Sequence, residues 1–169
     1  MTHITILGID PGSRRVGFAV IELFSNGDMR AVRGWEANVG DKGEAADRLP
    51  QIADEVEAAI FVNGADQVVM EAGFHSNNYK ATEALSMVRG VIHLIARKLG
   101  KPKVESYNPS KLKSIVGGRG SGRGKEFVKN GVRTILGVTT KNDNIADAFA
   151  VAIVHALAIT APRQSSLVA

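Results

Sequence analysis

Four carboxylates in this 169-residue chain occupy positions where they could act together chemically. Asp10 and Glu71 each follow a short apolar run typical of a strand, whereas Asp143 and Asp147 stand four residues apart at the start of an apolar, helix-spaced segment. Residues four apart share one helix face, so Asp143 and Asp147 are expected to lie together beside an apolar stripe. Carboxylates beside a core are costly to bury unless they are paired or bind a metal.

These residue types favour a divalent cation as the partner. No lysine or arginine lies within one helical turn of Asp147. Mg²⁺ prefers carboxylate oxygens and keeps water and substrate phosphate in its shell. Two such ions, about 4 Å apart, would activate a water and stabilise the leaving oxygen of a phosphodiester.

Each acid also has an ordinary structural interpretation, which the sequence leaves open. Asp10 precedes Pro-Gly and could be a turn residue, and Glu71 could simply end a strand. Asp143 could cap the last helix, and Asp147 could interact with the helix dipole. The placement of all four, at two strand ends and one helix start, favours a shared site.

Charge is unevenly distributed along the chain, whose formal net charge is +4. Residues 98–133 hold ten basic and two acidic groups, whereas residues 36–71 hold nine acidic and two basic groups. A basic block of this kind suits binding to a phosphate backbone, although a solvated surface would have the same composition. The absence of cysteine excludes disulfides, thiolate metal sites and thiol catalysis.

The order of expected elements predicts an α/β fold. Strands are expected over 5–9, 16–24, 29–35, 67–70 and 103–107, and helices over 44–62, 77–99, 109–116, 125–136 and 144–159. Three antiparallel strands followed by two parallel ones would form a five-stranded mixed sheet with helices on both faces. We expect one domain over residues 1–161 and a flexible tail over 162–169.

Four segments resemble, in order, the motifs of the RuvC family of Holliday junction resolvases. They are Ile6–Ser13 with Val16-Gly17; Val68–Glu71 with Phe74; Pro109, Lys113, Val116-Gly117 and Lys125; and Ile145–Ala148 with Ala150–Ala152. The match extends over about residues 4–158. The first segment alone is less specific, because similar strings open actin-like ATPase domains. Such an ATPase would need a second nucleotide-binding domain, for which 169 residues are too few.

The resemblance implies an RNase H-like fold, a homodimer, and Mg²⁺-dependent cleavage of four-way DNA junctions, with Mn²⁺ as a substitute. Paired symmetric nicks would leave 5′-phosphate and 3′-hydroxyl ends. It further implies that Asp10, Glu71 and Asp147 are catalytic metal ligands. The family usually has a fourth acid three residues before the last aspartate, where this chain has Asn144. Either Asn144 or the neighbouring Asp143 would then supply the fourth ligand.

The resemblance also implies roles in DNA binding. Phe74 would stack on an unpaired base at the crossover, and Lys113 and Lys125 would approach the scissile phosphate. Further contacts to the DNA backbone are expected from Lys111, Arg119, Arg123 and Lys129.

The expected setting is the cytoplasm of a bacterial or phage-infected cell, close to the nucleoid, with no membrane partner. The chain has no uninterrupted apolar run of the ~20 residues that span a membrane. Part of the apolar side of helix 77–99 is expected to form the dimer seam; otherwise that side packs wholly on the sheet. Two functional alternatives stay open, a nuclease with broader branched-DNA or hybrid specificity and a junction-binding protein with weakened catalysis.

Overall fold

The computed structural model describes residues 2–73, 78–117 and 125–161, and within this part five strands form one sheet in the order β3-β2-β1-β4-β5. The strands are β1 (His3–Asp10), β2 (Arg15–Phe24), β3 (Met29–Asn38), β4 (Gln67–Glu71) and β5 (Glu105–Tyr107). β2 pairs antiparallel with both β1 and β3, whereas β4 is parallel to β1 and β5 is parallel to β4. The predicted mixed sheet, with three antiparallel strands followed by two parallel ones, is therefore confirmed.

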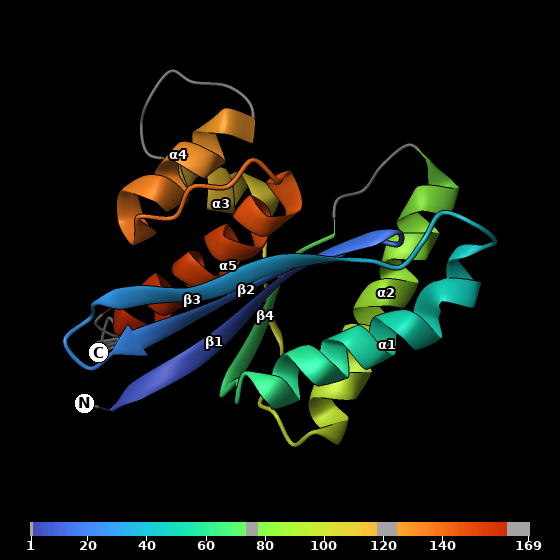
Figure 1. Ribbon diagram of the computed structural model, residues 1–169, viewed down its shortest axis with the longest axis horizontal. Helices are drawn as coiled ribbons and strands as arrows, with labels where there is room; N and C mark the ends of the chain where they lie inside the picture. The colour runs from blue at the N-terminus through green and yellow to red at the C-terminus, as the bar shows by residue number, and fades with distance from the viewer. Residues whose placement is uncertain (1, 74–77, 118–124, 162–169) are drawn as a thin grey trace, which may run out of the picture.

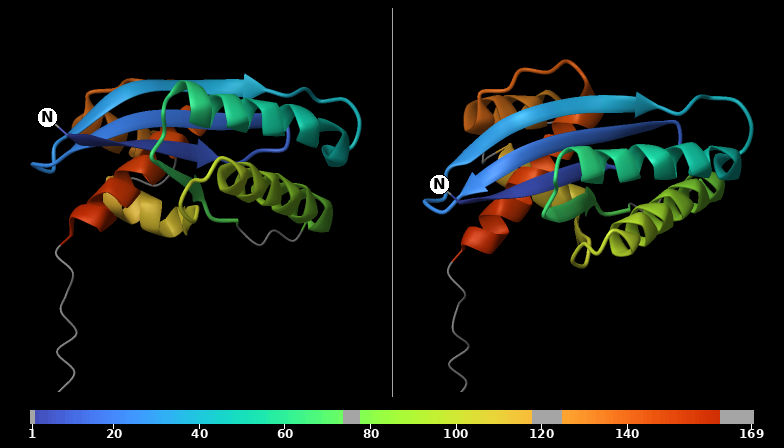
Figure 2. Two further views of the ribbon diagram at one scale, coloured as in Figure 1. Left: turned by 90° about the horizontal axis from the view of Figure 1, so that it is seen from below. Right: turned by 60° about the horizontal axis from the view of Figure 1, so that its bottom comes forward.

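Helices cover both faces of this sheet, as expected (Figures 1 and 2). One face carries α1 (Ala45–Val62) and α2 (Tyr79–Lys98), and the other carries α3 (Pro109–Val116), α4 (Lys125–Leu136) and α5 (Asp143–Thr160). Two apolar cores result, one between the sheet and the α1–α2 pair and one between the sheet and α5. The predicted α/β architecture, a mixed sheet between two layers of helices, is therefore confirmed.

Several element boundaries differ from the predicted ones for identifiable reasons. β3 continues to Asn38 because β2 starts at Arg15, which offers it a pairing partner. β5 begins only at Glu105, where pairing with β4 starts. The alternative interpretation of Asp143 as the cap of the last helix is excluded, because the N-cap is Asn142, whose Oδ1 accepts a hydrogen bond from the Ile145 amide at 3.1 Å.

The helix α5 lies unusually close to the sheet. A Cβ atom added at Gly8 of β1 would stand 2.2 Å from the backbone oxygen of Ala148. Ten residues of α5 are buried, so this helix forms the centre of one core. By length and composition α5 would also suffice to cross a membrane, a test that buried core helices pass as well.

This close approach predicts a large effect of a single methyl group. Gly8→Ala should lower the free energy of unfolding by about 2 kcal/mol, because the added Cβ forces α5 away from β1. Gly90→Ala in α2 is the matched control, since nothing lies within 4 Å of its Cβ position, and it should raise stability by up to about 1 kcal/mol. Urea denaturation monitored by circular dichroism measures both. Equal stabilities for Gly8→Ala and wild type would contradict the proposed packing.

Candidate metal centre

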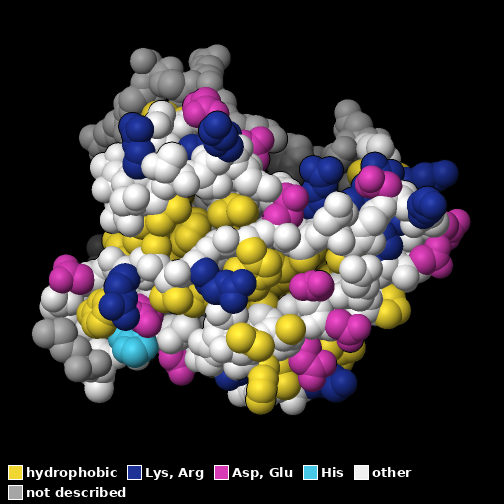
Figure 3. Space-filling model, in the orientation of Figure 1, with side chains coloured by type: hydrophobic (Ala, Val, Ile, Leu, Met, Phe, Trp, Pro, Cys, Tyr) yellow, Lys and Arg dark blue, Asp and Glu magenta, His cyan; other side chains and the backbone are white. Residues whose placement is uncertain are grey.

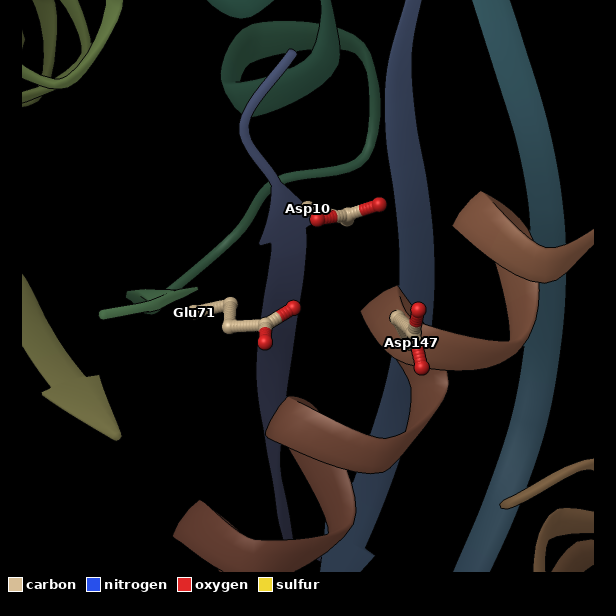
Figure 4. A group of neighbouring side chains, drawn as sticks. All are labelled: Asp10, Glu71 and Asp147. Carbon is tan, nitrogen blue, oxygen red and sulfur yellow. The ribbon is translucent and has the colours of Figure 1, made fainter. Parts of the chain in front are cut away.

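Three of the predicted acids meet at one edge of the sheet. Asp10 is the last residue of β1 and Glu71 the last of β4, and these two strands are parallel neighbours, so both side chains stand at the same edge. The second turn of α5 brings Asp147 over that edge. One carboxylate oxygen from each residue lies within 4.8 Å of the others. Figure 4 shows the three side chains close together, coming from the ends of two strands and from a helix.

The electrostatics of this cluster are unfavourable for a full set of negative charges. The pKa of Glu71 is raised from 4.5 to about 7, first by burial and then by the negative charge of Asp147. A side-chain hydrogen bond with Asp10 and the nearby charge of Lys113 act in the opposite direction but are weaker. A group of half-buried carboxylate oxygens that resists full ionisation fits a hard divalent cation, which would supply the missing positive charge.

The two candidates for a fourth ligand have other contacts. Asp143 Oδ1 lies 2.8 Å from Nζ of Lys129 in α4, and this contact raises the pKa of Lys129. Asn144 donates a hydrogen bond through Nδ2 to Glu36 Oε2 at 2.6 Å. Among the described residues, the group that could hold a metal comprises Asp10, Glu71 and Asp147 alone. A fourth ligand remains a prediction from the resemblance.

The predicted DNA-binding residues fall into two sets. Lys113 is exposed and close enough to Glu71 to influence its pKa, whereas Lys111 leans over the ring of Tyr107, with Nζ 5.3 Å from the centroid. Lys129 is held by Asp143 and by Glu126. The other predicted contacts lie outside the described residues (Phe74, Arg119 and Arg123, together with the side chain of Lys125, the first residue of α4). Figure 3 shows basic side chains both over the region of α3 and α4 and over the region of α1 and α2.

Arg89 is a neighbour of the site that the sequence interpretation missed. It lines a small cavity of about 160 Å³ together with Asp10, Glu71 and Leu85. This places Arg89 of α2 on the same small cavity as two of the three acids. The available signal was an arginine on the otherwise apolar side of a helix, four residues after Leu85. Without the fold, nothing in the sequence indicates that this side reaches the acids.

The raised pKa of Glu71 predicts a specific pH dependence of stability without metal. The folded state binds the proton of Glu71 more tightly than the unfolded chain does. The contribution of protonated Glu71 to the free energy of unfolding is therefore complete below about pH 4.5 and is lost as the pH rises through about 7. In EDTA, the unfolding free energy of wild type should therefore fall between pH 5 and pH 8 relative to that of Glu71→Gln. Urea titrations at each pH measure this difference, and added Mg²⁺ should reduce it. Parallel pH profiles for the two proteins would contradict it.

Comparison with known proteins shows which family the chain resembles. Residues 6–155 match the family model described as "Crossover junction endodeoxyribonuclease RuvC". Proteins of that name from Chelativorans sp. and Halothermothrix orenii are each 34% identical over 154 residues, covering 90% of this chain and 88% and 92% of theirs.

Solved structures agree with the sequence matches. The Thermus thermophilus RuvC structure is 26% identical, with a TM-score of 0.78, and covers 92% of this chain and 96% of its own. T. thermophilus RuvC in complex with a Holliday junction substrate has the same fold, with a TM-score of 0.80 at 24% identity over 94% of this chain and 97% of its own. Since the family model and the curated relatives span nearly the whole described fold, this chain belongs to the RuvC family of crossover junction endodeoxyribonucleases.

Proposed function

We propose that this chain is a Holliday junction resolvase, a divalent-metal-dependent endodeoxyribonuclease that cuts four-way DNA junctions. The observation that carries the proposal is the convergence of Asp10, Glu71 and Asp147 in a member of the RuvC family. The names of the curated relatives and the junction complex of T. thermophilus RuvC support the same substrate. The basic block over residues 98–133 suits an anionic partner of this size.

Within this proposal, Asp10, Glu71 and Asp147 hold Mg²⁺, with Mn²⁺ as a substitute and two ions in each site. The bound metal supplies Lewis-acid activation of the attacking water and stabilisation of the leaving oxygen. Lys113, beside Glu71, offsets the negative charge that develops on the scissile phosphate. Hydrolysis leaves 5′-phosphate and 3′-hydroxyl ends.

A homodimer would place two such sites for paired, symmetric nicks, since a two-fold protein matches a roughly two-fold junction. Val88, Ile92 and Ile95 on the apolar side of α2 are buried in the core, so the predicted seam on this helix would use its exposed apolar side chains, Tyr79 and Leu94, which are exposed by 76% and 59%. The proposed place of action is the bacterial cytoplasm, where the junction DNA is found.

Replacing the first acid tests this proposal. Asp10→Asn should reduce single-turnover cleavage of a synthetic four-way junction at least about 100-fold, because it removes the negative charge of a direct metal ligand. Junction binding, measured by gel shift in Ca²⁺, should be retained. Asp54→Asn, at an exposed acid on α1, is the matched control and should cut like wild type.

Two outcomes would replace the proposal by its alternatives. If wild type binds the junction but does not nick it in Mg²⁺ or Mn²⁺, the chain is a junction-binding protein, an alternative that the neutral Asn144 favours. If flaps and three-way junctions are cut as fast as four-way junctions, the specificity is that of a broader branched-DNA nuclease.

The role of Lys113 gives a separate prediction. Lys113→Ala should slow cleavage by about 100-fold while changing the junction Kd by less than about 3-fold, because its charge acts mainly on the reacting phosphate. Arg97→Ala, at an exposed residue in the last turn of α2 and outside the basic block, should leave both quantities unchanged. A Lys113→Ala protein that loses binding and rate in equal measure would make Lys113 a simple backbone contact.

A further inference from the structure

A row of four residues crosses the sheet at the level of the metal centre. Asp10 of β1 pairs with Gly17 of β2, and Gly17 pairs with Glu36 of β3. On the other side of β1, Ile9 pairs with Met70 of β4. The next residue of each strand, Asp10 and Glu71, therefore lies opposite the other. Opposed residues of neighbouring strands face the same side, so both acids of the metal centre and Glu36 lie on the side covered by α5. Two strand spacings put Glu36 about 10 Å from Asp10.

The first turn of α5 lies directly on Gly17, the residue of this row that has no side chain. A Cβ atom at Gly17 would stand 2.2 Å from the backbone oxygen of Asn144, so the missing side chain leaves the space that the helix occupies. In Figure 4, α5 crosses the strands next to the one that carries Asp10. The helix start is therefore placed between Asp10 on one side and Glu36 on the other.

Glu36 holds this turn through two hydrogen bonds. Its Oε2 accepts Nδ2 of Asn142 at 3.0 Å and Nδ2 of Asn144 at 2.6 Å, and Arg15 Nε lies 4.0 Å from its other oxygen. The Glu36 side chain is only 17% exposed, and hydrogen bonds to a carboxylate in such a place are among the stronger ones. The Oδ1 of Asn142 caps α5 by accepting the Ile145 amide, so the same side chain joins the cap to Glu36.

We propose that Glu36 is a positioning residue for the metal centre, which holds the start of α5 through Asn142 and Asn144 and thereby sets where Asp147 stands relative to Asp10 and Glu71. Asp147 is three residues after Asn144, on the same side of the helix. Partners that orient a metal ligand typically change metal affinity by 10- to 100-fold when they are removed. Residue 144 then serves as an anchor, with its amide paired to an acid on β3. The inference rests on the proposed function only for its consequence in cleavage.

The test compares Glu36→Ala with Glu36→Gln in the full chain. The glutamine variant keeps an oxygen that accepts both amides, whereas the alanine variant removes it. Glu36→Ala should weaken Mn²⁺ binding about 10-fold, measured by EPR titration and calorimetry, whereas Glu36→Gln should stay within about 2-fold of wild type. The metal concentration for half-maximal junction cleavage should rise in parallel, with the junction Kd in Ca²⁺ unchanged.

Glu22→Ala is the control for a merely structural effect. Glu22 is a 15% exposed carboxylate on β2 that accepts two hydrogen bonds from Arg30, at 2.8 and 2.5 Å, and lies away from the metal centre. Its loss should lower stability without changing Mn²⁺ affinity. If Glu36→Ala also binds Mn²⁺ like wild type, or if Glu36→Gln loses as much affinity as Glu36→Ala, the positioning role is wrong.

Exchanging the donor and the acceptor tests the hydrogen bond between Asn144 and Glu36 directly. Asn144→Asp places a carboxylate against Glu36 and should weaken Mn²⁺ binding. The double variant Glu36→Gln/Asn144→Asp should restore it, because the amide introduced at position 36 could donate to residue 144 and still accept from Asn142. An Asn144→Asp protein that binds Mn²⁺ more tightly than wild type would overturn the proposal. A wild type that binds Mn²⁺ but cuts no junction would refute the proposed function alone, since metal affinity still tests Glu36.

Discussion

The close approach of three acidic side chains, Asp10, Glu71 and Asp147, is the constraint on which this structure depends. Three carboxylates approach within 4.8 Å in a half-buried site, and their burial and mutual repulsion raise the pKa of Glu71 to about 7. Side chains in such an arrangement would separate if their backbones were free to move. Two of them are therefore placed at the ends of hydrogen-bonded parallel strands, and the third is on a helix whose other residues form a core.

The helix α5 combines two tasks that the rest of the fold keeps compatible. Its apolar residues fill the space above the sheet, and its first two turns carry the polar groups. Glycines at positions 8 and 17 let the helix approach the strands more closely than any side chain would allow. Contacts from opposite sides, Lys129 to Asp143 and Glu36 to Asn144, fix the first turn. A helix held so closely transmits small shifts of its start to Asp147.

The surroundings of the acids are consistent with an anionic substrate. A phosphodiester brought to three carboxylates adds negative charge to a site that already resists full ionisation, so positive charge must be present. A divalent cation would supply most of it, and Lys113 and Arg89 lie at the border of the same site. The basic block over residues 98–133 has the sign of charge that suits attraction of DNA at longer range.

Much of this molecule could be predicted from sequence, because the signals are local. Apolar runs and helix-spaced apolar residues predicted the five strands and five helices that the described residues form, and the positions of Asp10, Glu71 and Asp147 at the ends of such segments predicted their convergence. Contacts between elements distant in the chain were not predictable. Arg89 of α2 shares a cavity with Asp10 and Glu71, and Glu36 contacts Asn144 across more than 100 residues. Periodicity reports which face of an element is buried, whereas which polar side chains meet depends on how the packed elements are aligned, and that is decided only in the folded chain.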